Sequence, residues 1–172
     1  MPPHPKITRW QDIERDTDTT TRGKDESLSR GAAFGDHFGF TRVGIHHERL
    51  LPGRRSSFAH AESTEDEFIY VLEGTPDVWL DGHLHRLAPG DAVGFLAGDA
   101  MAHTFLNNTE AEVRLLVVGD KTRDDNRILY PLNPELRAGR EGWWWDDAPA
   151  RALGPHDGLP DARRGLGADK SP

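Results

Sequence analysis

The chain has no cysteine, no long apolar run and no cluster of basic residues, and each absence excludes a class of function. Without cysteine there is no disulfide, thiolate metal site or cysteine nucleophile, so a bound metal must be held by His, Asp, Glu or carbonyl oxygen. A net charge of -8 argues against nucleic acid and anionic membranes as partners. No apolar run reaches membrane-spanning length, and Met1–Pro5 lacks an apolar signal core, so we expect a cytoplasmic protein.

The distribution of apolar and polar residues along the sequence predicts one domain flanked by two polar arms. Only 35% of the 172 residues are hydrophobic, which suits a core smaller than the whole chain. Residues 1–30 are rich in Thr, Asp and Arg and predict an N-terminal arm, with Trp10 among its candidate docking points. Residues 31–120 carry the barrel. Residues 121–172 form a C-terminal arm, which we expect Trp143–Trp145 to anchor on the barrel or on a dimer partner.

Residues 31–120 consist of short apolar or alternating runs separated by Gly, Pro and Asp turns. The pair Asp81-Gly82 between two such runs predicts a tight hairpin. Many short strands at regular spacing indicate an all-β sandwich or barrel. The predicted strands are Thr41–Leu50, Ser56–Glu62, Glu67–Glu73, Asp77–Leu80, His83–Leu87, Ala92–Leu96, His103–Asn107 and Val113–Val118.

Four side chains of the predicted barrel form the candidate site. Residues i and i+2 of a strand point to the same face, so His60 and Glu62 should project together. A turn then lets Glu67 begin the next strand beside them, and His103 can complete the set from a later strand. The sequence therefore predicts a polar pocket built from these four residues.

These residues resemble the two motifs of the cupin superfamily over roughly the middle half of the chain. The matching positions are Gly53, His60, Glu67 and Gly74, followed by Gly90, Gly98, His103 and Asn107. The resemblance implies a cupin double-stranded β-helix, a jelly-roll-like conical barrel, with a homodimer as the expected assembly. The wider pattern is also similar to a group of small single-domain bacterial cupins, some of which are described as sugar-phosphate-isomerase-like.

The resemblance implies a divalent metal ion held by His60, Glu62, Glu67 and His103. The chain departs from the family pattern at Glu62, which stands where the motif usually has a second His, and at Leu96, which stands where it has Pro. A mixed nitrogen and oxygen ligand set suits Zn, Mn, Fe or Ni. Without a cation, the two neighbouring carboxylates should repel each other, so that the pKa of one rises and it takes up a proton.

Two functions follow from this pocket. The first is a metal-dependent enzyme acting on a small carbonyl, hydroxy-acid or sugar-type substrate by isomerase, lyase or oxygenase chemistry, with Glu62 or Glu67 as the catalytic acid or base. The alternative is a non-catalytic cupin that binds or senses a small molecule in the same pocket. The simplest alternative to both functions is a polar pocket that only hydrogen-bonds water.

Other histidines and aromatic residues have simpler expected roles. His83 and His85 follow a hairpin turn and are expected to face solvent. His46 and His47 are adjacent on a strand, so one of them should face the barrel interior. Tyr70 has the opposite parity from Glu67 and should lie outside the pocket.

Overall fold

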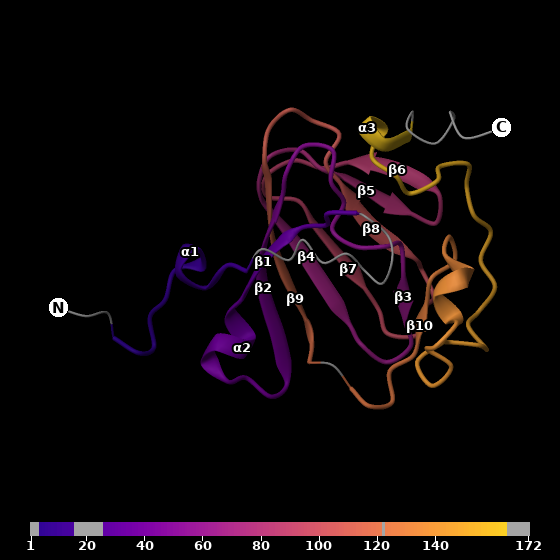
Figure 1. Ribbon diagram of the computed structural model, residues 1–172, viewed down its shortest axis with the longest axis horizontal. Helices are drawn as coiled ribbons and strands as arrows, with labels where there is room; N and C mark the ends of the chain where they lie inside the picture. Colours follow the sequence, from indigo (N-terminus) through magenta and orange to yellow (C-terminus); the bar gives the residue numbers. More distant parts are fainter. Residues whose placement is uncertain (1–3, 16–25, 122, 165–172) are drawn as a thin grey trace.

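The computed structural model of the protein describes residues 4–15, 26–121 and 123–164, and strands dominate them (Figure 1). The helices are short and lie outside the body formed by the strands. The elements in chain order are α1 (Trp10–Ile13), β1 (Arg30–Ala33), α2 (Phe34–Phe38), β2 (Val43–Leu50), β3 (Ala61–Glu62), β4 (Glu67–Glu73), β5 (Asp77–Leu80), β6 (His83–Arg86), β7 (Ala92–Phe95), β8 (His103–Leu106), β9 (Val113–Asp120), β10 (Ile128–Leu129), the 3₁₀-helix η1 (Pro134–Arg137) and α3 (Asp161–Arg164).

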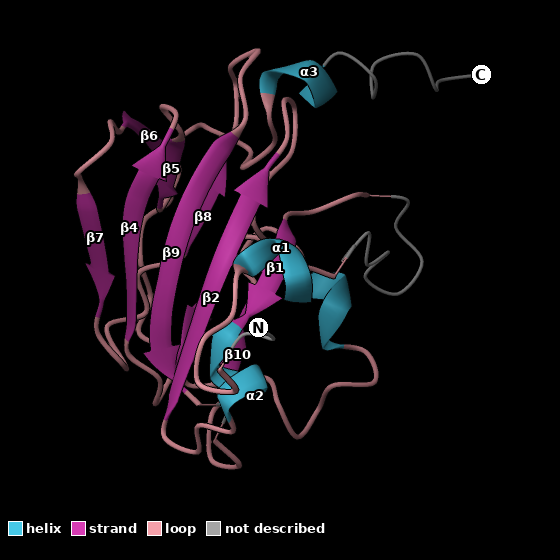
Figure 2. Ribbon diagram, turned by 90° about the vertical axis from the view of Figure 1, so that its left-hand side faces the viewer, coloured by secondary structure: helices cyan, strands magenta, loops and turns pink. Residues whose placement is uncertain are grey.

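The strands form the expected all-β barrel from antiparallel sheets. The larger sheet has the order β1-β2-β9-β4-β7, and Figure 2 shows these strands side by side. A second sheet has the order β6-β5-β8, and β3 pairs with β10 in a short ribbon. The main core unites side chains of the two larger sheets: Leu50, Ile69, Val71, Val78, Phe95, Phe105, Val113 and Leu115.

Strand β4 shows how alternation places side chains on the two faces of the large sheet. Ile69 and Val71 are buried, whereas Phe68, Tyr70 and Leu72 between and beside them are exposed. The sequence EFIYVLE is apolar on both faces, so parity rather than hydrophobicity decides which residues enter the core. The predicted position of Tyr70 outside the pocket is confirmed.

The predicted hairpin at Asp81-Gly82 is confirmed between β5 and β6. Both residues have positive φ, 44° for Asp81 and 92° for Gly82, as a type I′ turn requires. A Cβ atom on Gly82 would lie 2.3 Å from the backbone nitrogen of Gly154, so the close approach of the C-terminal segment also demands glycine there.

The predicted strand over residues 56–62 is shorter than expected. Only Ala61–Glu62 forms a strand. Before it, one serine and one threonine hydroxyl replace part of the backbone ladder with β8: Phe105 N donates to Ser56 Oγ at 3.1 Å, and Thr104 Oγ1 donates to the carbonyl of Ser57 at 2.8 Å. Side chains of this type compete with regular pairing because they hydrogen-bond nearby backbone groups.

Both arms contact the barrel through tryptophan. Trp10 of α1 stacks on His47 of β2, with ring centroids 4.6 Å apart and planes 13° apart. At the other end, Trp145 is buried in a second core cluster with Trp79 and small residues such as Ala61. Neither β1 nor α2 was predicted from the sequence. Within the described ranges, no helix has the length and apolar character that crossing a bilayer requires.

Candidate metal centre

Three of the four predicted ligands converge inside the barrel. His60 precedes β3, whereas Glu67 begins β4 and His103 begins β8. Their candidate ligand atoms all lie within 4.8 Å of one another. His103 Nε2 lies 2.8 Å from Glu67 Oε2, and the imidazole centroids of His60 and His103 are 4.9 Å apart. A backbone bridge between these two histidines fixes their relative height in the barrel.

The backbone orients both imidazoles. His60 Nδ1 lies 2.8 Å from the carbonyl oxygen of Phe58, and His103 Nδ1 lies 3.3 Å from that of Met101. A ring that donates from Nδ1 to a carbonyl presents the lone pair of Nε2, the arrangement found behind many metal-bound histidines. His60 has this arrangement, whereas Nε2 of His103 donates to Glu67 and would present its lone pair once a cation replaced that proton. Phe95 stacks on His103 with centroids 3.5 Å apart, which restricts rotation of that imidazole.

The electrostatics of the group favour metal-binding protonation states. Burial, reinforced by the neighbouring His103, lowers the pKa of His60 to about 4, so its imidazole is neutral near pH 7. For Glu67, burial alone would raise the pKa. The hydrogen bond from His103, together with the electrostatic interactions with His103 and His60, outweighs burial and lowers the pKa. A neutral imidazole and an ionised carboxylate are the forms that ligate cations.

The cavity beside the group is small and closed in by strands. Its volume is about 70 Å³, which accommodates an ion with a water molecule. It is lined by Glu48, Ser56, Ser57, His60, Glu67, Ile69, His103, Phe105, Leu115 and Val117.

The residues of this site lie within a stretch of the chain that matches a known family domain. The cupin domain matches residues 46–119, which include His60, Glu67 and His103. The match, with the solved structures below, supports a cupin-superfamily protein. A search of curated proteins finds no match to this cupin.

Solved structures agree with this assignment. A sugar phosphate isomerase of the cupin superfamily from Silicibacter pomeroyi is 36% identical over 59% of this chain, with a TM-score of 0.57. The match spans 64% of that protein, slightly less than two thirds of its length. A candidate sugar phosphate isomerase from Acidithiobacillus ferrooxidans is 27% identical over 73% of this chain and 81% of its own, with a TM-score of 0.62. A polyketide cyclase from Streptomyces resistomycificus, 18% identical over 81% of this chain and 98% of its own with a TM-score of 0.59, shows the fold alone.

Glu62, the fourth predicted ligand, is not a member of the group that the structure brings together. Its carboxyl interacts with Asn126 and Glu65 instead. Burial, followed by the negative charges of Glu65 and Glu67, raises the pKa of Glu62 to about 8, so this carboxyl holds a proton at neutral pH. The expected separation of the two pKa values is therefore present, with the proton on Glu62 and the charge on Glu67.

Sequence reasoning missed Glu48, which lines the same cavity from β2. Its Oε2 atom is buried and has no hydrogen-bond partner among the described residues. Burial raises the pKa of Glu48 to about 7, against the effect of a hydrogen bond with Ser29. Strand parity could have found it, because Glu48 lies two residues before the buried Leu50 and two after His46.

The histidines of β2 and β6 lie on the faces that the strand pattern predicts. His46 shares the inner face of β2 with Glu48 and is half-buried, whereas His47 lies on the outer face beneath Trp10. His83 and His85 on β6 are exposed, which confirms their expected orientation toward solvent.

Proposed function

We propose that this cupin is a metal-dependent enzyme acting on a small carbonyl, hydroxy-acid or sugar-type substrate. The group of His60, Glu67 and His103 is the observation that carries the proposal. The similarity to sugar phosphate isomerases supports isomerase chemistry as one reaction type. Lyase and oxygenase chemistry are the other two.

The donor set fits a divalent cation such as Zn, Mn, Fe or Ni. Nε2 of His60, Nε2 of His103 and the carboxylate of Glu67 would hold the ion and leave coordination positions open for substrate. A cation bound there supplies Lewis-acid polarisation of a carbonyl or hydroxyl oxygen. Bound metal would also replace the hydrogen bond that now joins His103 to Glu67.

Proton transfer would fall to carboxyl groups close to the ion. Glu48 faces the same cavity and keeps an unpaired oxygen there, so it can hold a proton at Oε2 and exchange it with a bound substrate. Glu67 would be occupied as a ligand. The acid–base role expected of Glu62 remains a prediction, and its position beside Asn126 requires a substrate that extends toward β10.

The metal content of purified protein tests the proposal. We expect about one equivalent of a divalent metal in the natural protein and less than about a tenth of that in His60→Ala/His103→Ala, because losing two of three ligands removes most of the binding free energy. His83→Ala/His85→Ala is the matched control, since it removes two exposed histidines of another strand. Equal metal in both double variants, or none in the natural protein after incubation with each ion, would contradict the proposal.

Turnover separates the enzyme from the alternative, a cupin that only binds or senses a small molecule. Metal-loaded protein is incubated with sugar phosphates and hydroxy acids, and products are followed by nuclear magnetic resonance. We expect conversion that Glu48→Gln slows by about 10²-fold or more, the usual contribution of a general acid or base. Tight binding without any conversion favours the sensing alternative.

The homodimer stays a proposal supported by the outer face of β4. Phe68 and Leu72 are 44% and 43% exposed, and Tyr70 beside them is also exposed. A row of exposed apolar side chains on a sheet is typical of protein interfaces. Light scattering should give twice the 19.2 kDa chain mass, and Phe68→Glu should reduce it to the monomer value.

A further inference from the structure

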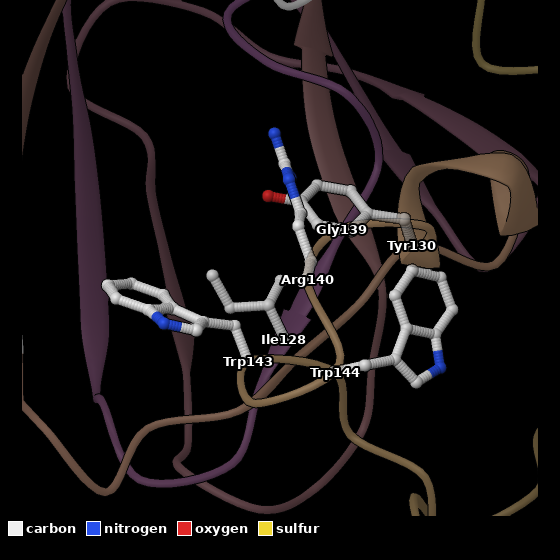
Figure 3. A pocket seen from close by; sticks show the side chains of 6 residues that line it. All are labelled: Ile128, Tyr130, Gly139, Arg140, Trp143 and Trp144. Carbon is white, nitrogen blue, oxygen red and sulfur yellow. The ribbon is translucent and has the colours of Figure 1, made fainter.

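A second pocket, larger than the metal-site cavity, lies on the C-terminal segment. Its volume is about 450 Å³, within the range typical of small-molecule sites. The lining residues, drawn in Figure 3, are Ile128, Tyr130, Gly139, Arg140, Trp143 and Trp144. None of them lines the cavity of about 70 Å³ beside His60, Glu67 and His103. The pocket is therefore a separate feature that the proposed metal chemistry does not use.

Backbone hydrogen bonds hold the walls of this pocket in place. Ile128 N donates to the carbonyl of Trp143 at 2.8 Å, and Trp145 N donates to the carbonyl of Ile128 at 3.1 Å. Trp143 N donates to the carbonyl of Arg140 at 2.8 Å, and Trp145 is buried in the core. Ile128 of β10 thus holds the segment on both sides of Trp144, so this part of the site is formed before any ligand arrives.

The aromatic side chains of the pocket are not used to fill the core. Trp143 is 59% exposed and Trp144 is half-buried, in contrast to the buried Trp145 beside them. The centroids of the Tyr130 and Trp144 rings are 6.1 Å apart at 40°, and Figure 3 shows the two indoles on opposite sides of the segment. Flat apolar faces of this kind bind the faces of rings, either aromatic rings or the C–H faces of sugars.

Arg140 adds a positive charge without a carboxylate partner. Its guanidinium lies 5.4 Å from the centroid of the Tyr130 ring, and it makes no ion pair among the described residues. Two other arginines of the C-terminal segment, by contrast, form ion pairs: Arg137 with Asp146 and Arg151 with Asp81. In a chain of net charge -8, an unpaired guanidinium inside an aromatic pocket matches a carboxylate or phosphate, which its forked donors bind in a bidentate manner.

We propose that this pocket binds a small organic anion whose ring stacks on the aromatic side chains and whose carboxylate or phosphate pairs with Arg140. The ligand would lie next to the metal group, because the Tyr130 ring is 6.0 Å from the ring of His60. Binding here does not require a metal ion, so the inference stands or falls independently of the proposed chemistry.

Two anions and their neutral analogues test the proposal in metal-free buffer with a chelator. Glucose 6-phosphate is compared with glucose, and benzoate with benzamide, by tryptophan fluorescence and by calorimetry. We expect at least one anion to bind with a Kd of about 1 mM or tighter and its neutral analogue to bind at least about tenfold more weakly. The anion that binds with the lower Kd shows whether the pocket prefers a sugar ring or an aromatic ring.

Variants of two nearby arginines complete the test. Arg140→Gln should raise the Kd of the better anion at least about tenfold, whereas Arg137→Gln, which removes the same charge three residues away, should change it less than about twofold. Arg140→Gln should leave the metal content unchanged. The proposal is overturned if neither anion binds up to about 20 mM, if the neutral analogues bind equally well, or if the two arginine variants have equal effects.

Discussion

The two cavities of this protein differ in how they are built. The metal-site cavity is small, and the ends of strands in both large sheets supply His103 and Glu67. The C-terminal pocket is about 450 Å³ and is framed by an irregular segment and the short β10. The first contains carboxyl and imidazole groups, and burial shifts the pKa values of Glu48 and His60 among them. The second contains aromatic rings and a guanidinium without an ion pair among the described residues.

This difference in construction matches two roles, reaction chemistry in the strand-built cavity and ligand recognition in the C-terminal pocket. Reactive groups must be held within a few tenths of an ångström, and paired strands provide that rigidity. A ligand pocket tolerates irregular backbone, provided that its walls are anchored, as Trp145 anchors this one. If this division holds, a change in one cavity should leave the other unaffected.

The largest effect is expected when the anchor of the C-terminal segment is removed. Trp145→Ala should lower the free energy of unfolding by about 3 kcal/mol or more, the usual result of deleting a buried tryptophan, and should abolish the C-terminal pocket. The metal content should stay near that of the natural protein, because no ligand lies on that segment. Urea denaturation measures the stability and metal analysis measures the metal content. If Trp145→Ala also lost its metal, the two cavities would not be independent.

Metal binding should stabilise the barrel by a smaller amount. An ion present at 100 times its Kd adds about 2.7 kcal/mol to the free energy of unfolding, which corresponds to a rise in Tm of roughly 5–10 °C for a chain of this size. Thermal unfolding with and without chelator measures the shift. His83→Ala/His85→Ala should keep the whole shift and His60→Ala/His103→Ala should lose it; a shift that survives in the second variant would place the ion elsewhere.

Glu48 should give metal-free protein a stability that falls as pH rises. The pKa of Glu48 is about 7 in the folded protein against 4.5 as the reference, so the folded state binds the proton more tightly. Stability is therefore lost as pH rises from about 4.5 to about 7 and changes little above that range. Glu48→Gln removes this contribution, so relative to the natural protein it should gain on the order of 2–3 kcal/mol between pH 5 and pH 8. Urea denaturation at both pH values checks this, and an unchanged difference would contradict it.

The smallest effect is expected from the exposed member of the tryptophan run. Trp143→Ala should change the free energy of unfolding by less than about 0.5 kcal/mol, because the side chain is 59% exposed. It should nevertheless weaken anion binding in the C-terminal pocket, where it is one of the walls. A large loss of stability would show that Trp143 belongs to the core and that the pocket is a by-product of packing.

The fold was predictable where local chemistry decides the structure. Asp81-Gly82 forms the expected turn because both positions need positive φ, which this pair adopts readily. The convergence of His60, Glu67 and His103 was implied by the motif spacing and is present.

The failures arose where a partner distant in sequence changes the local pattern. Glu62 was placed beside His60 by the parity of one continuous strand, but the strand begins only at Ala61 and pairs with β10. Its side chain therefore interacts with Asn126, which no spacing rule connects to it. The pocket around Arg140 likewise depends on an isolated β-bridge between Ile128 and Trp144. No pattern in the sequence predicts this contact.

Anomalous diffraction from crystals grown with zinc or manganese would locate a bound ion. We expect one strong peak about 2.0–2.3 Å from Nε2 of His60, Nε2 of His103 and the carboxylate of Glu67. A peak only at the exposed pair His83 and His85, or no peak within the barrel, would contradict this prediction.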